Sequence, residues 1–69
     1  MALTMRQWRR AKELTQEYMA EKLGVHINTY SNWEKEPQKI SIENSQKIAN
    51  VLCVPLNDII FRDAKEDQL

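Results

Sequence analysis

The chain has 69 residues, of which ten are basic and ten acidic, so its net charge is zero at neutral pH. A chain of this length forms one small domain, which buries only about 60% of its unfolded surface on folding. Cys53 is the single cysteine and His26 the single histidine, which excludes an internal disulfide and a zinc-ligand set. We therefore expect a cytoplasmic protein with no metal, no cofactor, no signal peptide and no membrane span.

Helical signals begin close to the start of the chain. Thr4 is followed three residues later by Gln7, which is the pattern of a capping box, and it predicts a first helix over residues 4–13. Thr15 predicts the start of a second helix, because its hydroxyl can accept a hydrogen bond from an amide of the first turn. This helix should end at Gly24, since glycine readily adopts the left-handed conformation that terminates helices.

Two more helices follow the glycine. A third helix is predicted over residues 27–34, and Pro37 stops it within a short polar loop. Ser41 is the predicted cap of a fourth helix, residues 42–52. Its inward stripe at helical spacing consists of Ile42, Ser45, Ile48, Ala49 and Leu52.

Pro55 marks the predicted start of a last short helix, because proline is tolerated in the first turn. This fifth helix would cover "LNDII", residues 56–60. The expected fold class is therefore all-α, a compact domain of five helices over residues 1–61. Residues 62–69 are predicted to form a polar C-terminal tail.

The second and third predicted helices, joined by a tight turn, make a helix-turn-helix at the centre of this fold. Small residues let the two helices approach each other, and apolar residues close a miniature core between them. The predicted core of this unit consists of Met19, Ala20, Leu23, Gly24, Val25, Tyr30 and Trp33.

Four residues remain for the opposite face of the third helix, namely Ile27, Asn28, Ser31 and Asn32. Their spacing places them side by side on one ridge. Such a ridge fits the DNA major groove, where asparagine can bond adenine N6 and N7, serine can bond several base edges, and isoleucine can pack on thymine methyl groups. The pattern therefore predicts base reading.

Three stretches carry a resemblance to a known family: "LTQEYMAEKLGV" at 14–25, "TYSNWE" at 29–34, and "SIENSQKIANVL" at 41–52 followed by "VPLNDII". Over roughly residues 4–61 the chain resembles the lambda-repressor-like helix-turn-helix DNA-binding domains (Cro/repressor-type, XRE-like) of phage and bacterial regulators. The resemblance implies a sequence-specific, double-stranded DNA-binding transcriptional regulator, a phage-type repressor or Cro-like switch protein. It also implies a homodimer on a palindromic operator.

The resemblance implies roles for further residues. Gln16, at the start of the second helix, matches a position that touches a DNA phosphate. Lys35 and Lys39 fall in the loop that contacts the DNA backbone. Arg9 and Glu34 match the two members of an internal ion pair, and Ile27, Asn28, Ser31 and Asn32 match base-facing positions.

Some features depart from the family pattern. Glu36 and Cys53 stand where relatives often have glycine, and no lysine or arginine lies within the predicted helix 27–34. Together with the zero net charge, these departures keep a second reading open, in which the same fold binds a partner repressor or a toxin protein in place of DNA. An enzyme is not indicated, because one histidine and no nucleophile–base pair offer nothing to build a catalytic site from.

The end of the predicted domain is unusually apolar. Leu56, Ile59 and Ile60 follow helical spacing and can face the core, whereas Val54 and Phe61 lie off that stripe. One interpretation is that Phe61, with Val54 or Ile60, forms part of a symmetric dimer contact. The alternative is that Phe61 folds back and closes the core of its own chain.

Overall fold

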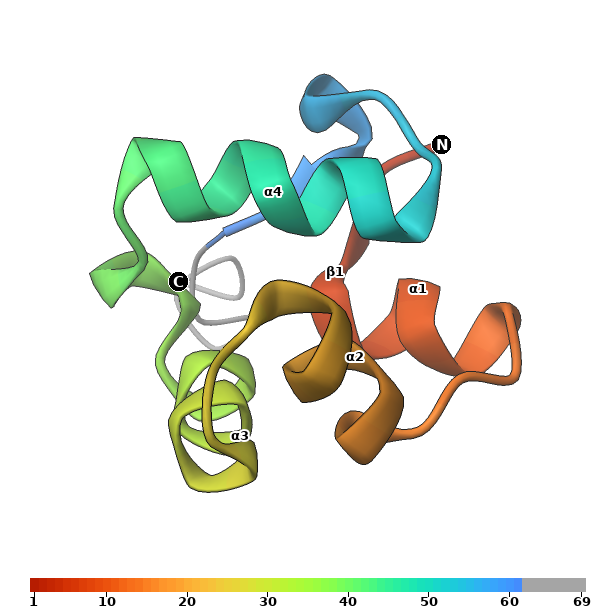
Figure 1. The fold of residues 1–69 in the computed structure, drawn as a ribbon. Coiled ribbons are helices and arrows are strands. Elements are labelled where there is room, and N and C mark those ends of the chain that lie inside the picture. The colour runs from red at the N-terminus through yellow and green to blue at the C-terminus, as the bar shows by residue number, and fades with distance from the viewer. Residues whose placement is uncertain (62–69) are drawn as a thin grey trace.

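Four α-helices account for most of residues 1–61, the part of the chain that the computed structural model describes. Figure 1 shows α4 lying across one side of the molecule, with α1, α2 and α3 grouped beneath it. In chain order the elements are β1 (Leu3–Thr4), α1 (Met5–Ala11), α2 (Gln16–Leu23), α3 (Ile27–Lys35), a 3₁₀ turn (Pro37–Lys39), α4 (Ile42–Leu52), a second 3₁₀ turn (Leu56–Asp58) and β2 (Ile59–Ile60). The helical fold class is confirmed, with four helices where five were expected.

Side-chain caps fix where three of these helices begin, as the sequence predicts. The Thr4 hydroxyl accepts a hydrogen bond of 3.2 Å from the amide of Gln7, and the Gln7 side chain accepts one of 2.9 Å from the amide of Thr4. Thr15 accepts from the third amide of α2 at 3.0 Å, and Ser41 does the same in α4 at 3.1 Å. These bonds satisfy amides that have no partner within the helix.

Left-handed residues follow the ends of three helices. Gly24 has φ 71° after α2, as expected for a glycine at that position. Glu13 has φ 58° and Cys53 has φ 59°, so two residues with a Cβ adopt the conformation that glycine prefers. Helix α1 is therefore shorter than predicted, because the chain turns at Glu13 and has already left the helix after Ala11.

The predicted fifth helix is wrong. After a single 3₁₀ turn the chain extends, and β2 pairs in parallel with β1, with Leu3 opposite Ile59 and Thr4 opposite Ile60. Two consecutive β-branched residues favour an extended backbone over a helix. The indole Nε1 of Trp8 also donates a hydrogen bond of 2.7 Å to the carbonyl of Asp58, which fixes the segment against α1.

The core is closed by residues from every helix and from β2. Its buried apolar members are Met5, Met19, Ala20, Tyr30, Ile48, Ala49, Leu52 and Ile59. Ile42 is not part of it: its side chain is 78% exposed, because it is the first residue of α4 and the buried stripe begins one turn later, at Ser45. Val54 and Phe61 lie off the predicted stripe but pack against the core, which for Phe61 agrees with the alternative that it closes the core of its own chain.

The predicted polar tail, residues 62–69, lies outside the described residues. Within residues 1–61, none of the helices combines the length and the apolar character needed to span a bilayer.

Candidate nucleic-acid interface

Helices α2 and α3 form the helix-turn-helix around Gly24. Among the predicted core residues of this unit, Met19, Ala20 and Tyr30 are buried. Leu23, Val25 and Trp33 are partly buried and pack against the core, whereas Gly24, also predicted as a core residue, is exposed in the turn. The rings of Tyr30 and Trp33 meet edge to face, with centroids 6.4 Å apart and planes at 69°.

The phenol of Tyr30 is buried within this packing. Burial raises the pKa of its hydroxyl above the ordinary value, so the group is neutral. The hydroxyl has no hydrogen-bond partner among the described residues. Tyr30 is therefore an anchor of the fold and does not face a ligand.

His26 starts the helix that the sequence marks for base reading. Its Nδ1 accepts a hydrogen bond of 3.0 Å from the amide of Asn28, which makes histidine the N-cap of α3. Nδ1 must be unprotonated to accept this bond. The histidine thereby serves the role that Ser, Thr, Asp or Asn usually fills at a helix start.

The outward face of α3 carries Asn28, Asn32 and Lys35, all three exposed. They are spaced four and three residues apart, so they lie in a row along one side of the helix. Lys35 is the last residue of α3, which corrects the prediction that this helix has no basic residue. Thr29 is also exposed beside this row, and no sequence pattern singled it out.

Two of the predicted base-reading residues are less accessible than expected. Ile27 is half-buried and packs against the hydrophobic core, because α3 is rotated so that its first apolar residue turns inward. Ser31 is also half-buried, at the side of the exposed row. Of the four predicted base-reading residues, only Asn28 and Asn32 are exposed.

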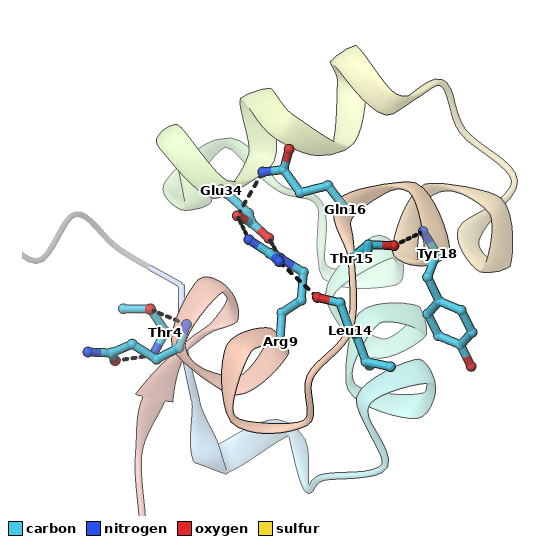
Figure 2. Close-up of polar contacts among 8 residues, drawn as sticks. Thr4, Arg9, Leu14, Thr15, Gln16, Tyr18 and Glu34 are labelled. Carbon is cyan, nitrogen blue, oxygen red and sulfur yellow. Dashed lines mark hydrogen bonds and ion pairs between the residues drawn. The ribbon is translucent and has the colours of Figure 1, made fainter.

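An ion pair joins α1 to the last turn of α3. The guanidinium of Arg9 donates to both carboxylate oxygens of Glu34, at 2.7 Å from Nε and 3.2 Å from Nη2 (Figure 2). Nη1 of the same arginine donates to the carbonyl of Leu14 at 2.9 Å. The two charged side chains are only 11% and 3% exposed, so the pair is almost fully removed from water.

Gln16 completes this cluster from the first position of α2. Its Nε2 donates a hydrogen bond of 3.0 Å to Glu34, and its amide oxygen points away from the pair (Figure 2). An amide nitrogen carries two hydrogens, so one remains for an acceptor outside the fold. The hydrogen bond to Glu34 thus holds the Gln16 side chain beside the last turn of α3.

Both acidic residues near the end of α3 have a basic partner, but only Glu34 is buried with its partner. Burial on its own would raise the pKa of Glu34, but its polar contacts, of which the hydrogen bond from Arg9 is the largest, outweigh burial and lower that pKa. The bond to Glu34 in turn raises the pKa of Arg9. Glu36 pairs with Lys39 at 2.7 Å on the surface. Glu34 is thus covered and paired, whereas the carboxylate of Glu36 stays half exposed beside Lys39.

Comparison with known families agrees with this geometry. A family model described as Helix-turn-helix matches residues 5–59, which is most of the chain. Searches of curated proteins and of solved structures find no match. The chain belongs to the helix-turn-helix family in its lambda-repressor-like form, a family of DNA-binding regulatory domains.

Proposed function

We propose that the chain is a sequence-specific transcriptional regulator, a phage-type repressor or Cro-like switch protein, that inserts α3 into the DNA major groove. The observation that carries this proposal is the row formed by Asn28 and Asn32, exposed one turn apart on α3. Each asparagine can bond N6 and N7 of one adenine at once. Ser31 and the exposed edge of Ile27 flank the row and add contacts to neighbouring bases.

Backbone contacts would hold this helix in register. Gln16 stands at the amino end of α2, where free amides and the positive end of the helix dipole favour a phosphate. Lys35 ends α3, and Lys39 lies in the 3₁₀ turn that follows it. These residues carry no sequence information, but they set the position and angle from which the asparagines read bases.

The pairing of Glu34 with Arg9 favours DNA over a protein partner as the ligand of the exposed side of α3. The zero net charge of the chain points away from DNA, but the charges around α3 are not evenly distributed. Glu34 is covered and bonded to Arg9, while Lys35 is exposed and has no carboxylate within 4.0 Å among residues 1–61. At the end of α3 a phosphate backbone therefore meets an exposed cation, while the neighbouring Glu34 is covered.

A single copy would read only a short half-site. We propose that two copies bind a palindromic operator, with their α3 helices in successive major grooves about 34 Å apart. The candidates for the contact between the copies are Ile60, which is half-buried and is not among the residues packed against the core, and the uncovered parts of Val54 and Phe61. A two-fold contact there would be self-complementary, each residue facing the same surface of the other copy.

Binding to a pool of random-sequence duplexes tests the proposal. Repeated selection should enrich a palindromic motif containing adenines, and fluorescence anisotropy should show tighter binding to this motif than to random DNA. Affinity for both must fall as salt rises, because neutralising Z phosphates releases counterions with a slope of about −0.9Z. Failure to bind any duplex at low salt would overturn the proposal and favour a protein partner.

A further inference from the structure

A surface hollow lies where the amino ends of α1 and α2 meet the last turn of α3. It has a volume of about 210 Å³ and is lined by Arg6, Arg9, Gln16, Ser31, Glu34 and Lys35. Two of these lining residues, Arg9 and Glu34, form the ion pair that Figure 2 shows. The hollow adjoins the base-reading face, because Ser31 and Lys35 belong to α3 itself.

The charges of this hollow are unequal. Glu34 is its one acidic lining residue, and its side chain is 3% exposed and bonded to Arg9 and Gln16. Arg6 and Lys35 are exposed, and neither has a carboxylate within 4.0 Å in the described part of the chain. Two cations that pair with no carboxylate of residues 1–61 thus border a hollow whose one acidic lining residue is already hydrogen-bonded.

We propose that this hollow is a phosphate seat, in which Arg6 of α1 and Lys35 of α3 grip one phosphate of the DNA backbone. The inference rests on the proposed function and adds α1 to the DNA-contacting surface. Arg6 presents a planar fork of donors that suits two phosphate oxygens, and Lys35 adds a compact charge. The second hydrogen on the Gln16 amide nitrogen and the Ser31 hydroxyl can complete the shell.

The Arg9–Glu34 pair explains why Arg6 is in position. It bonds the middle of α1 to the end of α3, and Arg6 lies three residues before Arg9 on the same side of α1. The buried pair therefore holds Arg6 beside Lys35, although the two are far apart in the sequence. Arg10 is one turn further along α1, is also exposed, and does not line the hollow.

The arginines of α1 provide a matched pair of variants, Arg6→Gln and Arg10→Gln, which change the net charge equally. Anisotropy titrations on one duplex, over a range of salt concentrations, give the slope of log affinity against log salt for each. Arg6→Gln should reduce this slope by up to about 0.9, equivalent to as much as eightfold weaker binding at 0.1 M salt. Arg10→Gln should have the same slope as the wild type. Arg6→Lys should also have the wild-type slope, because it keeps the positive charge.

Equal slopes for Arg6→Gln and Arg10→Gln would overturn the phosphate seat while leaving DNA binding by α3 intact. Melting curves establish that each variant is folded, which is expected because both arginines are exposed. If wild-type protein bound no duplex at all, the proposed function would fall and the seat with it. A loss of slope only in Arg6→Gln, with wild-type preference among DNA sequences, supports the seat.

Discussion

Arg9 Nε lies 2.7 Å from Glu34 Oε2, in a pair that is nearly closed to water and that connects α1 to the end of α3. A buried pair of this kind contributes little compared with an apolar pair, but a lone buried charge is costly. The pair therefore fixes the arrangement of the helices more than it adds to their stability. Removing one partner should therefore lower the free energy of unfolding more than the loss of the pair alone would, because it leaves the other charge buried without a partner.

We expect Glu34→Gln and Arg9→Met each to lower the free energy of unfolding by about 3–5 kcal/mol, since each leaves one charge buried without its partner. The double variant should cost clearly less than the two single costs together. Urea denaturation of all four proteins gives the coupling energy. The exposed pair Glu43 and Lys47, 3.6 Å apart on α4, is the control and should couple by no more than about 0.5 kcal/mol. Additive costs at Arg9 and Glu34 would contradict the buried-pair account.

Stability should depend on pH through Glu34. Its pKa is lower in the folded chain than its ordinary value of 4.5, so the folded state favours the ionised carboxylate. The stabilisation is present above about pH 4.5 and is lost as the pH falls through the lower folded value. Urea midpoints measured from pH 7 downward should fall steeply on the acid side for wild type and less steeply for Glu34→Gln. Glu21→Gln, which removes an exposed carboxyl, controls for the change in net charge.

Local signals predicted the beginnings of the helices well. Thr4, Thr15 and Ser41 cap the helices they were expected to cap, because a capping bond involves only the next three residues. The conformation of residues 56–60 could not be predicted from local signals of this kind. Ile59 and Ile60 pair with Leu3 and Thr4 and so join the two ends of the domain, a long-range contact that the local spacing suggesting a helix could not predict.

In the candidate site, too, some features follow from local sequence and others depend on how the helices pack. The row of Asn28 and Asn32 follows from helical periodicity and is exposed as expected. The inward turn of Ile27 depends on how far α3 is rotated against the core, which the sequence does not specify. Arg6 in the hollow depends on how α1 packs against α3, and its side chain carries no local signal of that role. Tertiary contacts decide both.

Base reading by α3 predicts a selective loss in two variants. Asn28→Ala and Asn32→Ala should each weaken binding to the selected operator by about 1–3 kcal/mol, the discrimination that one bidentate base contact provides. Binding to random DNA should hardly change, because phosphates supply it. Anisotropy on both duplexes measures the difference, with Asn50→Ala, an exposed asparagine of α4, as the control. Equal losses on the two duplexes would rule out base reading.

The proposed dimer contact can be separated from core packing by two neighbouring residues. Phe61 packs against the core, whereas Ile60 follows buried Ile59 on β2 and is only half-buried, since successive strand residues point to opposite faces. Ile60→Ser should shift sedimentation from dimer to monomer and keep the wild-type melting midpoint. Phe61→Ser should lower that midpoint. A wild-type protein that sediments as a monomer, free and on operator DNA, would defeat the contact.

Cys53 offers the most direct test of a strained backbone. It follows α4 with φ 59° and ψ 42°, a conformation that costs a residue with a Cβ about 1–2 kcal/mol and costs glycine far less. Glu36, the other position where relatives often have glycine, has φ −132° and carries no such strain. We therefore expect Cys53→Gly to stabilise the domain by about 1 kcal/mol, which raises the melting midpoint by about 4–8 °C. Cys53→Ala removes the same thiol but retains the Cβ, so it should melt close to wild type. If the two variants melted together, the gain would come from loss of the thiol and the left-handed conformation would carry no cost.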